Sequence, residues 1–236
     1  LVFPHHENES AQSEGATGKP FVHYWMHNGF INVDNQKMSK SLGNFFTVRD
    51  IAKEFDLEAV RMFMLGAQYR SPINFSREMI EQAKASLDRL YTARDHYLFL
   101  LQNAKDGEPG EKELALLEKV KAAREGFDEA MDDDLNTADA LSALFELARD
   151  ANSTITAANA PSRELCEFTL SLFNELAGVL GLLYKKKETS LDAEIEELIA
   201  QRTQARQNRD WATADRIRDE LKARGVVLKD TPQGVQ

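Results

Sequence analysis

The sequence is poor in cysteine and in long apolar runs, and each scarcity excludes a class of protein. Its 236 residues include one cysteine, Cys166, so a disulfide framework is excluded. Cys166 lies among apolar residues in a helical pattern, and we expect a buried structural thiol there. No run approaches the roughly 18 to 20 apolar residues that span a bilayer, and no apolar signal region opens the chain. We therefore expect a cytoplasmic protein without a membrane-bound part.

The sequence also lacks an initial methionine. It begins with Leu1, inside a pattern that is first apolar and then polar, and we expect a segment of a longer protein. With 42% hydrophobic and 29% charged residues, the composition is that of a globular protein and is too apolar for wholesale disorder. The length suits two or three small modules.

The first part of the chain is mixed in character. Pro4 suits the start of a helix that Gly15 and Gly18 end. Residues 21–27, FVHYWMH, predict a short buried strand, and NGFINV predicts a turn and a second short strand.

Loop and helix signals follow. Residues 34–44, DNQKMSKSLGN, have no apolar period and predict an exposed loop. Two short helices are expected next, TVRDIAKEF and LEAVRMFMLGA, with Thr47 and Asp56 as their N-caps.

From Ser76 the pattern changes to long amphipathic helices. A first helix runs from residue 77 to about 104, and others span about 111–130, 137–158 and 161–183. Short loops between them predict an antiparallel bundle. The buried stripe of the first helix is expected to contain Ile80, Leu87, Leu90, Tyr91, Tyr97, Leu98 and Leu101.

The charged stretch KKKETS predicts a linker after the bundle. Beyond it we expect two short helices split near Asp210, a left-handed C-cap at Gly225 and a strand-like VVLKD.

The stretch HHENE could bind a metal. On a helix, His5 and Glu9 are four residues apart and share a face, so an imidazole and a carboxylate could reach one ion. An exposed pair on a helix surface is the alternative. A zinc site also needs about four ligands, and His6 would point roughly 100° away from the pair.

Lys37 and Lys40 lie close together in KMSKSLGN, with Gly43 after them. Two ammonium groups beside backbone that a ligand can approach closely could neutralise the charge of a departing polyphosphate. An ordinary exposed loop is the alternative.

The motifs together resemble a known family. KMSKS is the signature loop of class I aminoacyl-tRNA synthetases. The chain also carries LVFPHHENE, WMHNG, KMSKSLGNFFTVRD, EAVRMFML, YRSPINFS, MDDDLNT and RDWATAD with GVVLKDTPQG. With these it resembles, from end to end, the second half of the cysteinyl-tRNA synthetases.

The resemblance implies a zinc ion that binds the thiolate of the substrate cysteine and is held by two cysteines, a histidine and a glutamate. His5 and Glu9 match the last two. A thiolate binds zinc far better than a serine hydroxyl does, so no editing site is needed. The HIGH loop and both zinc-binding cysteines are absent, so we expect the chain alone to be inactive.

The resemblance also implies that Lys37 and Lys40 contact the phosphates of ATP, a substrate that arrives with Mg²⁺. Trp25 and His27, in WMHNG, are expected to line the nucleotide side of the site. Packing in a core is the alternative for Trp25.

The C-terminal part carries a tRNA hypothesis. On a helix that begins at Asp210, Trp211 and Asp215 share a face, and an aromatic ring beside a carboxylate can stack on a base and accept from its edge. In the family, Arg206, Trp211, Asp215 and Asp230 match residues at the GCA anticodon. The alternative is that Trp211 anchors a small core.

The charge distribution fits this only in part. The net charge is −10, whereas a nucleic-acid binder usually has a basic surface. Residues 201–224 nevertheless carry seven basic and four acidic side chains. We expect RNA contacts there and only a modest dependence on salt.

We therefore expect a mostly α fold with a truncated α/β part. Its domains are the end of a class I Rossmann catalytic domain (1–75), a helical anticodon-binding bundle (76–187) and a small mixed α/β anticodon-recognition domain (188–236). The implied intact enzyme is a monomer that joins cysteine to tRNA-Cys with ATP. One rival activates cysteine but couples it to an amino sugar, and another is a non-catalytic tRNA-binding module.

Overall fold

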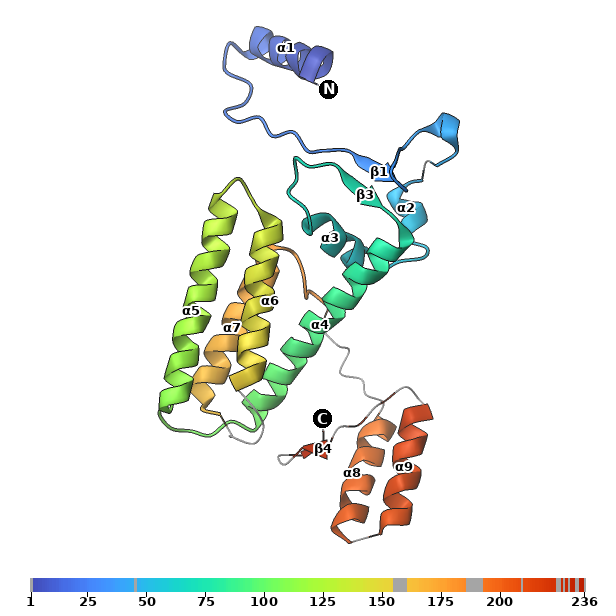
Figure 1. The fold of residues 1–236 in the computed structure, drawn as a ribbon, viewed down its shortest axis with the longest axis vertical. Helices are drawn as coiled ribbons and strands as arrows, with labels where there is room; N and C mark the ends of the chain where they lie inside the picture. The colour runs from blue at the N-terminus through green and yellow to red at the C-terminus, as the bar shows by residue number, and fades with distance from the viewer. Residues whose placement is uncertain are drawn as a thin grey trace.

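The computed structural model describes residues 2–44, 46–154, 161–185, 193–208, 210–223, 226, 228, 230–231 and 234–235. Most of them are helical (Figure 1). The helices are η1 (Val2–His6), α1 (Glu7–Thr17), η2 (Lys40–Leu42), α2 (Val48–Ile51), α3 (Leu57–Leu65), α4 (Arg77–Gln102), α5 (Glu111–Asp132), α6 (Thr137–Thr154), α7 (Arg163–Val179), α8 (Ala193–Gln207) and α9 (Trp211–Ala223). The strands are β1 (Ile31–Val33), β2 (Gln36–Lys37), β3 (Ile73–Phe75), β4 (Asp230–Thr231) and β5 (Gly234–Val235).

The N-terminal helix α1 stands at one end of the molecule, joined to the sheet by an extended segment (Figure 1). It ends as predicted at Gly18, which adopts a left-handed φ of 65° and donates its N–H to Glu14. Gly15, the other predicted terminator, lies inside the helix. None of the residues of α1 is buried.

The buried strand predicted at residues 21–27 is wrong. The segment forms no strand, and its large apolar side chains are exposed, with 89% of Tyr24 accessible to solvent. A buried strand needs neighbours that bond its N–H and C=O groups and cover its side chains. No strand pairs with this segment within the described part of the chain.

A three-stranded sheet in the order β2-β1-β3 lies at the centre of the first part. β1 pairs antiparallel with β2, and it pairs parallel with β3 in a register that sets Ile31 opposite Ile73. Asp34 and Asn35 join β1 to β2 with φ values of 47° and 61°, the backbone of a tight two-residue hairpin turn.

The exposed loop predicted at residues 34–44 is therefore wrong in part, because Gln36 and Lys37 pair with β1 as β2, and η2 follows. The stretch has no apolar periodicity, but Asp34 and Asn35 form a two-residue hairpin turn, and such a turn needs no long apolar pattern beside it.

The two predicted N-caps are confirmed. Thr47 and Asp50 form a capping box at the start of α2, and the Asp56 carboxylate accepts from the Glu58 N–H at 3.0 Å. The helices pack on the sheet around a small core of Val33, Ala59, Phe75 and Ile80.

Helices α4 to α7 form the predicted antiparallel bundle and alternate in direction (Figure 1). Ile80, near the start of α4, belongs to the small sheet core, whereas Leu87, Leu90 and Tyr97 belong to the bundle core. This one helix therefore connects the two cores. The prediction that Leu98 is buried is wrong, since 43% of it is exposed.

The fourth bundle helix is shorter than predicted. α7 ends at Val179, and Gly181 and Leu183 follow with φ values of 65° and 58° that no helix can continue. Cys166 lies on α7 and is buried, as predicted.

The C-terminal helices α8 and α9 pack on one another through a face that includes Ala205, Ala214, Ile217 and Leu221. They are split near Asp210, as predicted. Of the strand-like VVLKD, Asp230 lies in β4, which pairs with β5. KKKETS starts within the described residues and continues beyond them, and Gly225 lies outside them.

The predicted fold class, mostly α with a small α/β part, is confirmed. The two boundaries between the three predicted domains stay a prediction, and the one at 187/188 lies outside the described residues. Among the described helices, none combines the length and the apolar character that crossing a bilayer requires.

Candidate functional site

The two lysines of the KMSKS stretch lie in the β1–β2 hairpin and the loop that follows it, residues 31–44, which we call the lysine hairpin. Lys37 ends β2 with an exposed side chain, and Lys40 is the first residue of η2. The Asn44 amide closes the loop, since it donates to the Lys37 carbonyl at 3.2 Å and accepts from the Ser39 N–H at 2.8 Å. Within the described residues, Lys37 has no ion-pair partner, so its ammonium group can meet a ligand.

The turn of this hairpin is also bound to the sheet. The Asn35 N–H donates to the Asn74 side chain at 2.6 Å, and the Asp34 N–H donates to the Phe75 carbonyl at 3.1 Å. Both acceptors lie on β3. The lysines therefore have a backbone whose position is set by the strand that leads into α4.

His5 and Glu9 lie on consecutive helical turns, in η1 and α1, and both are exposed. Imidazole and carboxylate are zinc ligands, so the donor types fit half of a zinc site. The described part of the chain gathers no group of three or more His, Cys, Asp or Glu side chains around a metal position. Cys166 does not complete the set, because it is buried in the bundle core on α7, whereas His5 and Glu9 are exposed in η1 and α1.

Trp25 and His27 both contact His6, which was not predicted to lie beside them. The His6 ring stacks near Trp25 with 5.1 Å between centroids, and its Nδ1 lies 3.0 Å from Nε2 of His27. Trp25 is 47% exposed and lies outside both hydrophobic cores. Side chains two apart on an extended segment share a face, a signal that could have grouped Trp25 with His27 but could not have added His6.

The anticodon candidates divide between the two C-terminal helices. Trp211 opens α9 with 59% of its surface exposed, and Asp215 follows one turn later in an ion pair with Arg218 at 2.9 Å. Arg206, half-buried, lies near the end of α8. Asp230 lies in β4.

Hydrogen bonds to Asp210 hold the start of α9. The Asp210 carboxylate accepts from the Thr213 N–H at 3.1 Å, and hydrogen bonds from Thr213 lower the pKa of Asp210. The Asp210 N–H returns to the Ala205 carbonyl at 2.8 Å. Arg206, near the end of α8, and Trp211, at the start of α9, therefore lie on either side of the same connection between the two helices.

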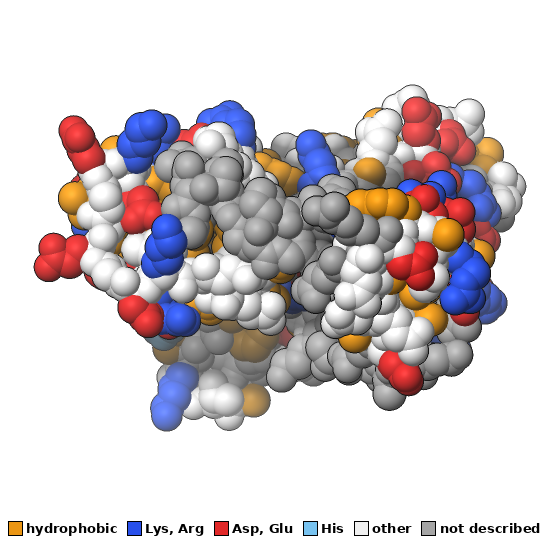
Figure 2. All heavy atoms as spheres, turned by 90° about the horizontal axis from the view of Figure 1, so that it is seen from below, with side chains coloured by type: hydrophobic (Ala, Val, Ile, Leu, Met, Phe, Trp, Pro, Cys, Tyr) orange, Lys and Arg blue, Asp and Glu red, His pale blue; other side chains and the backbone are white. Residues whose placement is uncertain are grey.

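Charges of both signs share the surface of this part of the molecule. In the view of Figure 2, basic and acidic side chains are interspersed over the lobe of α8 and α9 and do not gather by sign. The local excess of basic residues is thus offset by neighbouring carboxylates, such as Asp215 and Asp219 beside Arg218.

The bundle is fastened to the sheet region at the turn between α5 and α6. Asp134, with a φ of 56°, accepts from Tyr69 Oη at 2.9 Å and from Gln68 at 3.1 Å, and forms an ion pair with Arg70. The MDDDLNT motif, which the sequence left without a role, therefore holds the segment that leads into β3.

Three family models match successive parts of the chain. The model for the tRNA synthetases class I (C) catalytic domain matches residues 1–85, and the DALR domain matches residues 126–184. The Cysteinyl-tRNA ligase anticodon binding domain matches residues 188–236.

Curated relatives match the chain over its whole length. Proteins named Cysteine--tRNA ligase from Lachnospira eligens and Clostridioides difficile are each 54% identical over all 236 residues. The chain spans about half the length of these relatives, 50% in each case.

One solved structure supports the fold. The ternary complex of Agrobacterium radiobacter K84 agnB2 LeuRS with tRNA and LeuAMS matches with a TM-score of 0.58 and 20% identity, over 72% of this chain and 22% of that one. The three family models and the two relatives identify the chain as a member of the cysteinyl-tRNA synthetase family.

Proposed function

We propose that this chain supplies the ATP-phosphate contacts and the tRNA contacts of a cysteine–tRNA ligase. The intact enzyme joins cysteine to ATP as cysteinyl-adenylate with release of pyrophosphate, and then transfers the cysteinyl group to the 3′ end of tRNA-Cys. The observation that carries this proposal is 54% identity to two cysteine–tRNA ligases across all 236 residues. The amino-sugar rival is not favoured, since a small acceptor needs no anticodon-binding part.

The lysine hairpin is proposed to act on the leaving group. As the bond to the α-phosphate breaks, negative charge grows on the departing pyrophosphate, and ammonium groups stabilise that charge more than they stabilise bound ATP. Lys37 is exposed on a backbone fixed by Asn35 and Asn44, so little reorganisation is needed to meet this charge. Lys40 is proposed as its companion, with Mg²⁺ carried in by ATP.

Trp25 and His27 are proposed to border the nucleotide. Their rings lie nearly parallel, with an interplanar angle of 13°, on a segment that runs directly into β1 and the lysine hairpin. An exposed pair of nearly parallel aromatic rings offers a face on which a purine can stack.

His5 and Glu9 are proposed as two ligands of a zinc ion in the intact enzyme. The chain holds no second cysteine and no HIGH sequence, so the remaining ligands and the other phosphate contacts must come from elsewhere. We therefore expect no adenylate formation by the chain alone. ATP–pyrophosphate exchange above background with the purified chain would contradict this.

The end of the chain is proposed to read the anticodon. Trp211 presents an exposed ring for stacking on an unpaired base, and the Asp215 carboxylate can accept from a base edge once its pair with Arg218 opens. Arg206 and Asp230 are proposed to contact the same nucleotides.

The test is a titration of the chain against a tRNA with a GCA anticodon and against the same tRNA with G34 replaced, each at two salt concentrations. We expect the replacement to cost about 1 to 3 kcal/mol, the usual cost of one mismatched base. Equal affinity for both tRNAs that falls with salt would indicate phosphate contacts alone, and it would contradict anticodon reading. Absence of binding would contradict tRNA as a partner of this chain.

A further inference from the structure

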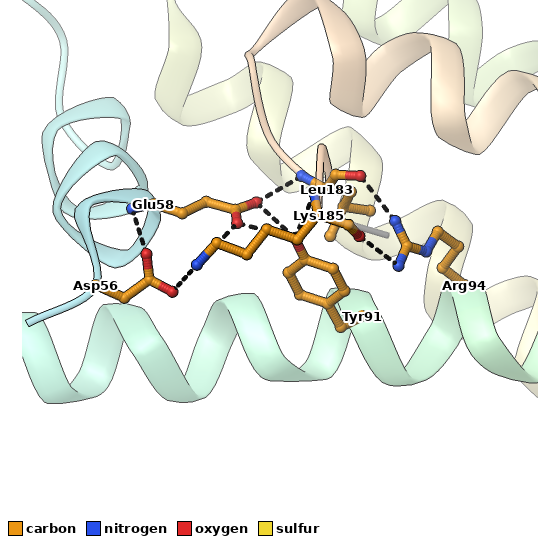
Figure 3. A network of polar contacts seen from close by, with 6 residues as sticks. All are labelled: Asp56, Glu58, Tyr91, Arg94, Leu183 and Lys185. Carbon is orange, nitrogen blue, oxygen red and sulfur yellow. Dashed lines mark hydrogen bonds and ion pairs between the residues drawn. The ribbon is translucent and has the colours of Figure 1, made fainter. Parts of the chain in front are cut away.

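The segment that leaves the bundle after α7 is irregular, yet the N–H and C=O groups of Leu183 and Lys185 are all hydrogen-bonded. Figure 3 shows Leu183 and Lys185 surrounded by side chains of α3 and α4. Leu183 has a φ of 58°, a conformation that costs a non-glycine residue energy and persists only where its surroundings enforce it.

Side chains bond both the N–H and the C=O group of Leu183 and of Lys185. The Leu183 N–H donates to Glu58 Oε1 at 2.7 Å, and the Lys185 N–H donates to Tyr91 Oη at 3.2 Å. Arg94 donates to the carbonyls of Leu183 and Lys185, at 2.7 and 3.1 Å. Main-chain groups that would bond within a helix or sheet are here held by three side chains.

The carboxylate of Glu58 is the centre of this arrangement. It is 1% exposed and accepts from Tyr91 Oη, at 2.8 Å to its nearer oxygen, besides the Leu183 N–H. A buried carboxylate is costly unless it is hydrogen-bonded and paired, and here both needs are met. Lys185 supplies the charge, as its ammonium pairs with Asp56 and lies 3.9 Å from Glu58.

The bend that precedes these residues is also restricted. Gly181 has a φ of 65°, and a Cβ at this position would lie 2.8 Å from a guanidinium nitrogen of Arg61 on α3. Helix α3 therefore contacts the exit segment at both Gly181 and Leu183. We call the set of Asp56, Glu58, Tyr91, Arg94 and Lys185 the exit clamp.

We propose that the exit clamp positions the C-terminal module, α8 and α9, for tRNA by fixing the point at which the chain leaves the bundle. The proposal rests on the proposed function, because it assigns the clamp to the binding of a tRNA that touches more than one part of the chain. Glu58 is its main positioning residue.

Chain geometry gives the size of the effect. From Lys185 to Ala193 there are eight peptide steps, so Ala193 lies within about 28 Å of Lys185. If the clamp were lost and the chain were free from Leu180 onward, thirteen peptide steps would let Ala193 lie up to about 45 Å from Leu180. The effective concentration of one binding part near the other falls roughly as the −3/2 power of tether length, which gives a loss of about twofold. Without the clamp the chain would also leave the bundle in no fixed direction, which lowers the effective concentration further.

The test compares two RNAs on the chain: a whole tRNA with a GCA anticodon, and the isolated anticodon stem–loop. In Glu58→Ala and Lys185→Met we expect affinity for the whole tRNA to fall by about two- to fivefold, while affinity for the stem–loop is unchanged. Glu58→Gln keeps an acceptor for the Leu183 N–H and should lose less. The matched control is Glu118→Gln, which removes an exposed ion pair with Lys121 on α5.

A second measurement needs no RNA. Spin labels on Lys84→Cys in α4 and Gln204→Cys in α8 report the distance between the bundle and the C-terminal module, with buried Cys166 left unlabelled. We expect the distance distribution to broaden in Glu58→Ala and in Lys185→Met, but not in Glu118→Gln.

The outcomes separate the inference from the proposed function. Equal losses for both RNAs, or an unchanged distance distribution, would overturn the positioning role of the clamp. A wild-type chain that binds neither RNA, with a distribution that broadens as expected, would leave the clamp as a positioning device and overturn the proposed tRNA partner.

Discussion

The N–H of Gly29 donates to the carbonyl of Tyr69 at 2.7 Å, and the backbones of the two segments touch at this point. A Cβ on Gly29 would overlap the Ser71 carbonyl and lie 2.8 Å from the Pro72 nitrogen. Tyr69 in turn donates to Asp134. Through these successive contacts, the turn between α5 and α6 of the bundle fixes the position of the segment that leads into β1, beside β3.

Gly29→Ala should therefore destabilise the protein. Because the neighbouring atoms are backbone and cannot swing aside, we expect a loss of about 1 to 3 kcal/mol in the free energy of unfolding. Urea denaturation followed by circular dichroism measures it. Gly15→Ala is the matched control, since nothing lies within 4 Å of a Cβ there and α1 should gain slightly in helix propensity. Equal effects of the two substitutions would contradict the close-contact argument.

Cys166 should be unreactive in the folded protein. Burial on α7 raises the pKa of its thiol to about 11. At pH 8 the sulfur is therefore out of reach of a reagent, and it is also protonated rather than present as the reactive thiolate. We expect its reaction with a disulfide reagent to follow local or global unfolding and to accelerate with added urea. A cysteine placed at exposed Gln204 serves as the reference. If Cys166 reacted at the reference rate in the absence of urea, the buried assignment would be wrong.

Long periodic patterns were predicted well, because an amphipathic helix carries its own signal in every turn. The four bundle helices and the caps at Thr47 and Asp56 follow from local sequence. The strand expected at residues 21–27 failed for the opposite reason. Its apolar and aromatic content predicts a strand only if other strands cover it, and the described residues supply none.

The exit clamp could not be predicted either. The Glu58 carboxylate bonds to an N–H that lies 125 residues further along the chain, at Leu183. In the sequence, Glu58 is one acidic residue in the first turn of a helix, where acidic residues are ordinary. The lysine hairpin was recognised by its motif, yet its pairing as β2 came from the turn at Asp34 and Asn35.

Tyr91→Phe tests the clamp through pH. Burial, with the hydrogen bond to Glu58, raises the pKa of Tyr91 to about 12 from an ordinary value of 10. The folded state keeps the phenolic proton above pH 10 while the unfolded state loses it, so this stabilisation is complete below pH 10 and is lost between pH 10 and 12.

We expect Tyr91→Phe to lower the free energy of unfolding by about 1 kcal/mol at pH 7, the net worth of a typical hydrogen bond. The gap between wild type and variant should be constant below pH 10 and shrink above it. Urea unfolding at pH 7, 9, 10.5 and 11.5 measures the gap. A gap that widens with rising pH would mean that Tyr91 does not hold its proton.

Trp211→Ala should weaken tRNA binding without changing stability. The ring is 59% exposed at the start of α9, so its removal leaves no cavity, whereas stacking on a base is worth about 1 to 3 kcal/mol. We expect the dissociation constant for a tRNA with a GCA anticodon to rise by roughly 5- to 150-fold, with the melting temperature unchanged. Trp211→Phe keeps a ring and should retain most of the affinity.

The matched control is the chain's other tryptophan, since Trp25→Ala also removes an exposed ring but from the segment before β1. For the isolated anticodon stem–loop, Trp25→Ala should bind as the wild type does and Trp211→Ala should not. If both substitutions weakened the stem–loop equally, the rings would act by general attraction for RNA. If neither did, base recognition would have to come from Arg206, Asp215 and Asp230 without a stacking platform.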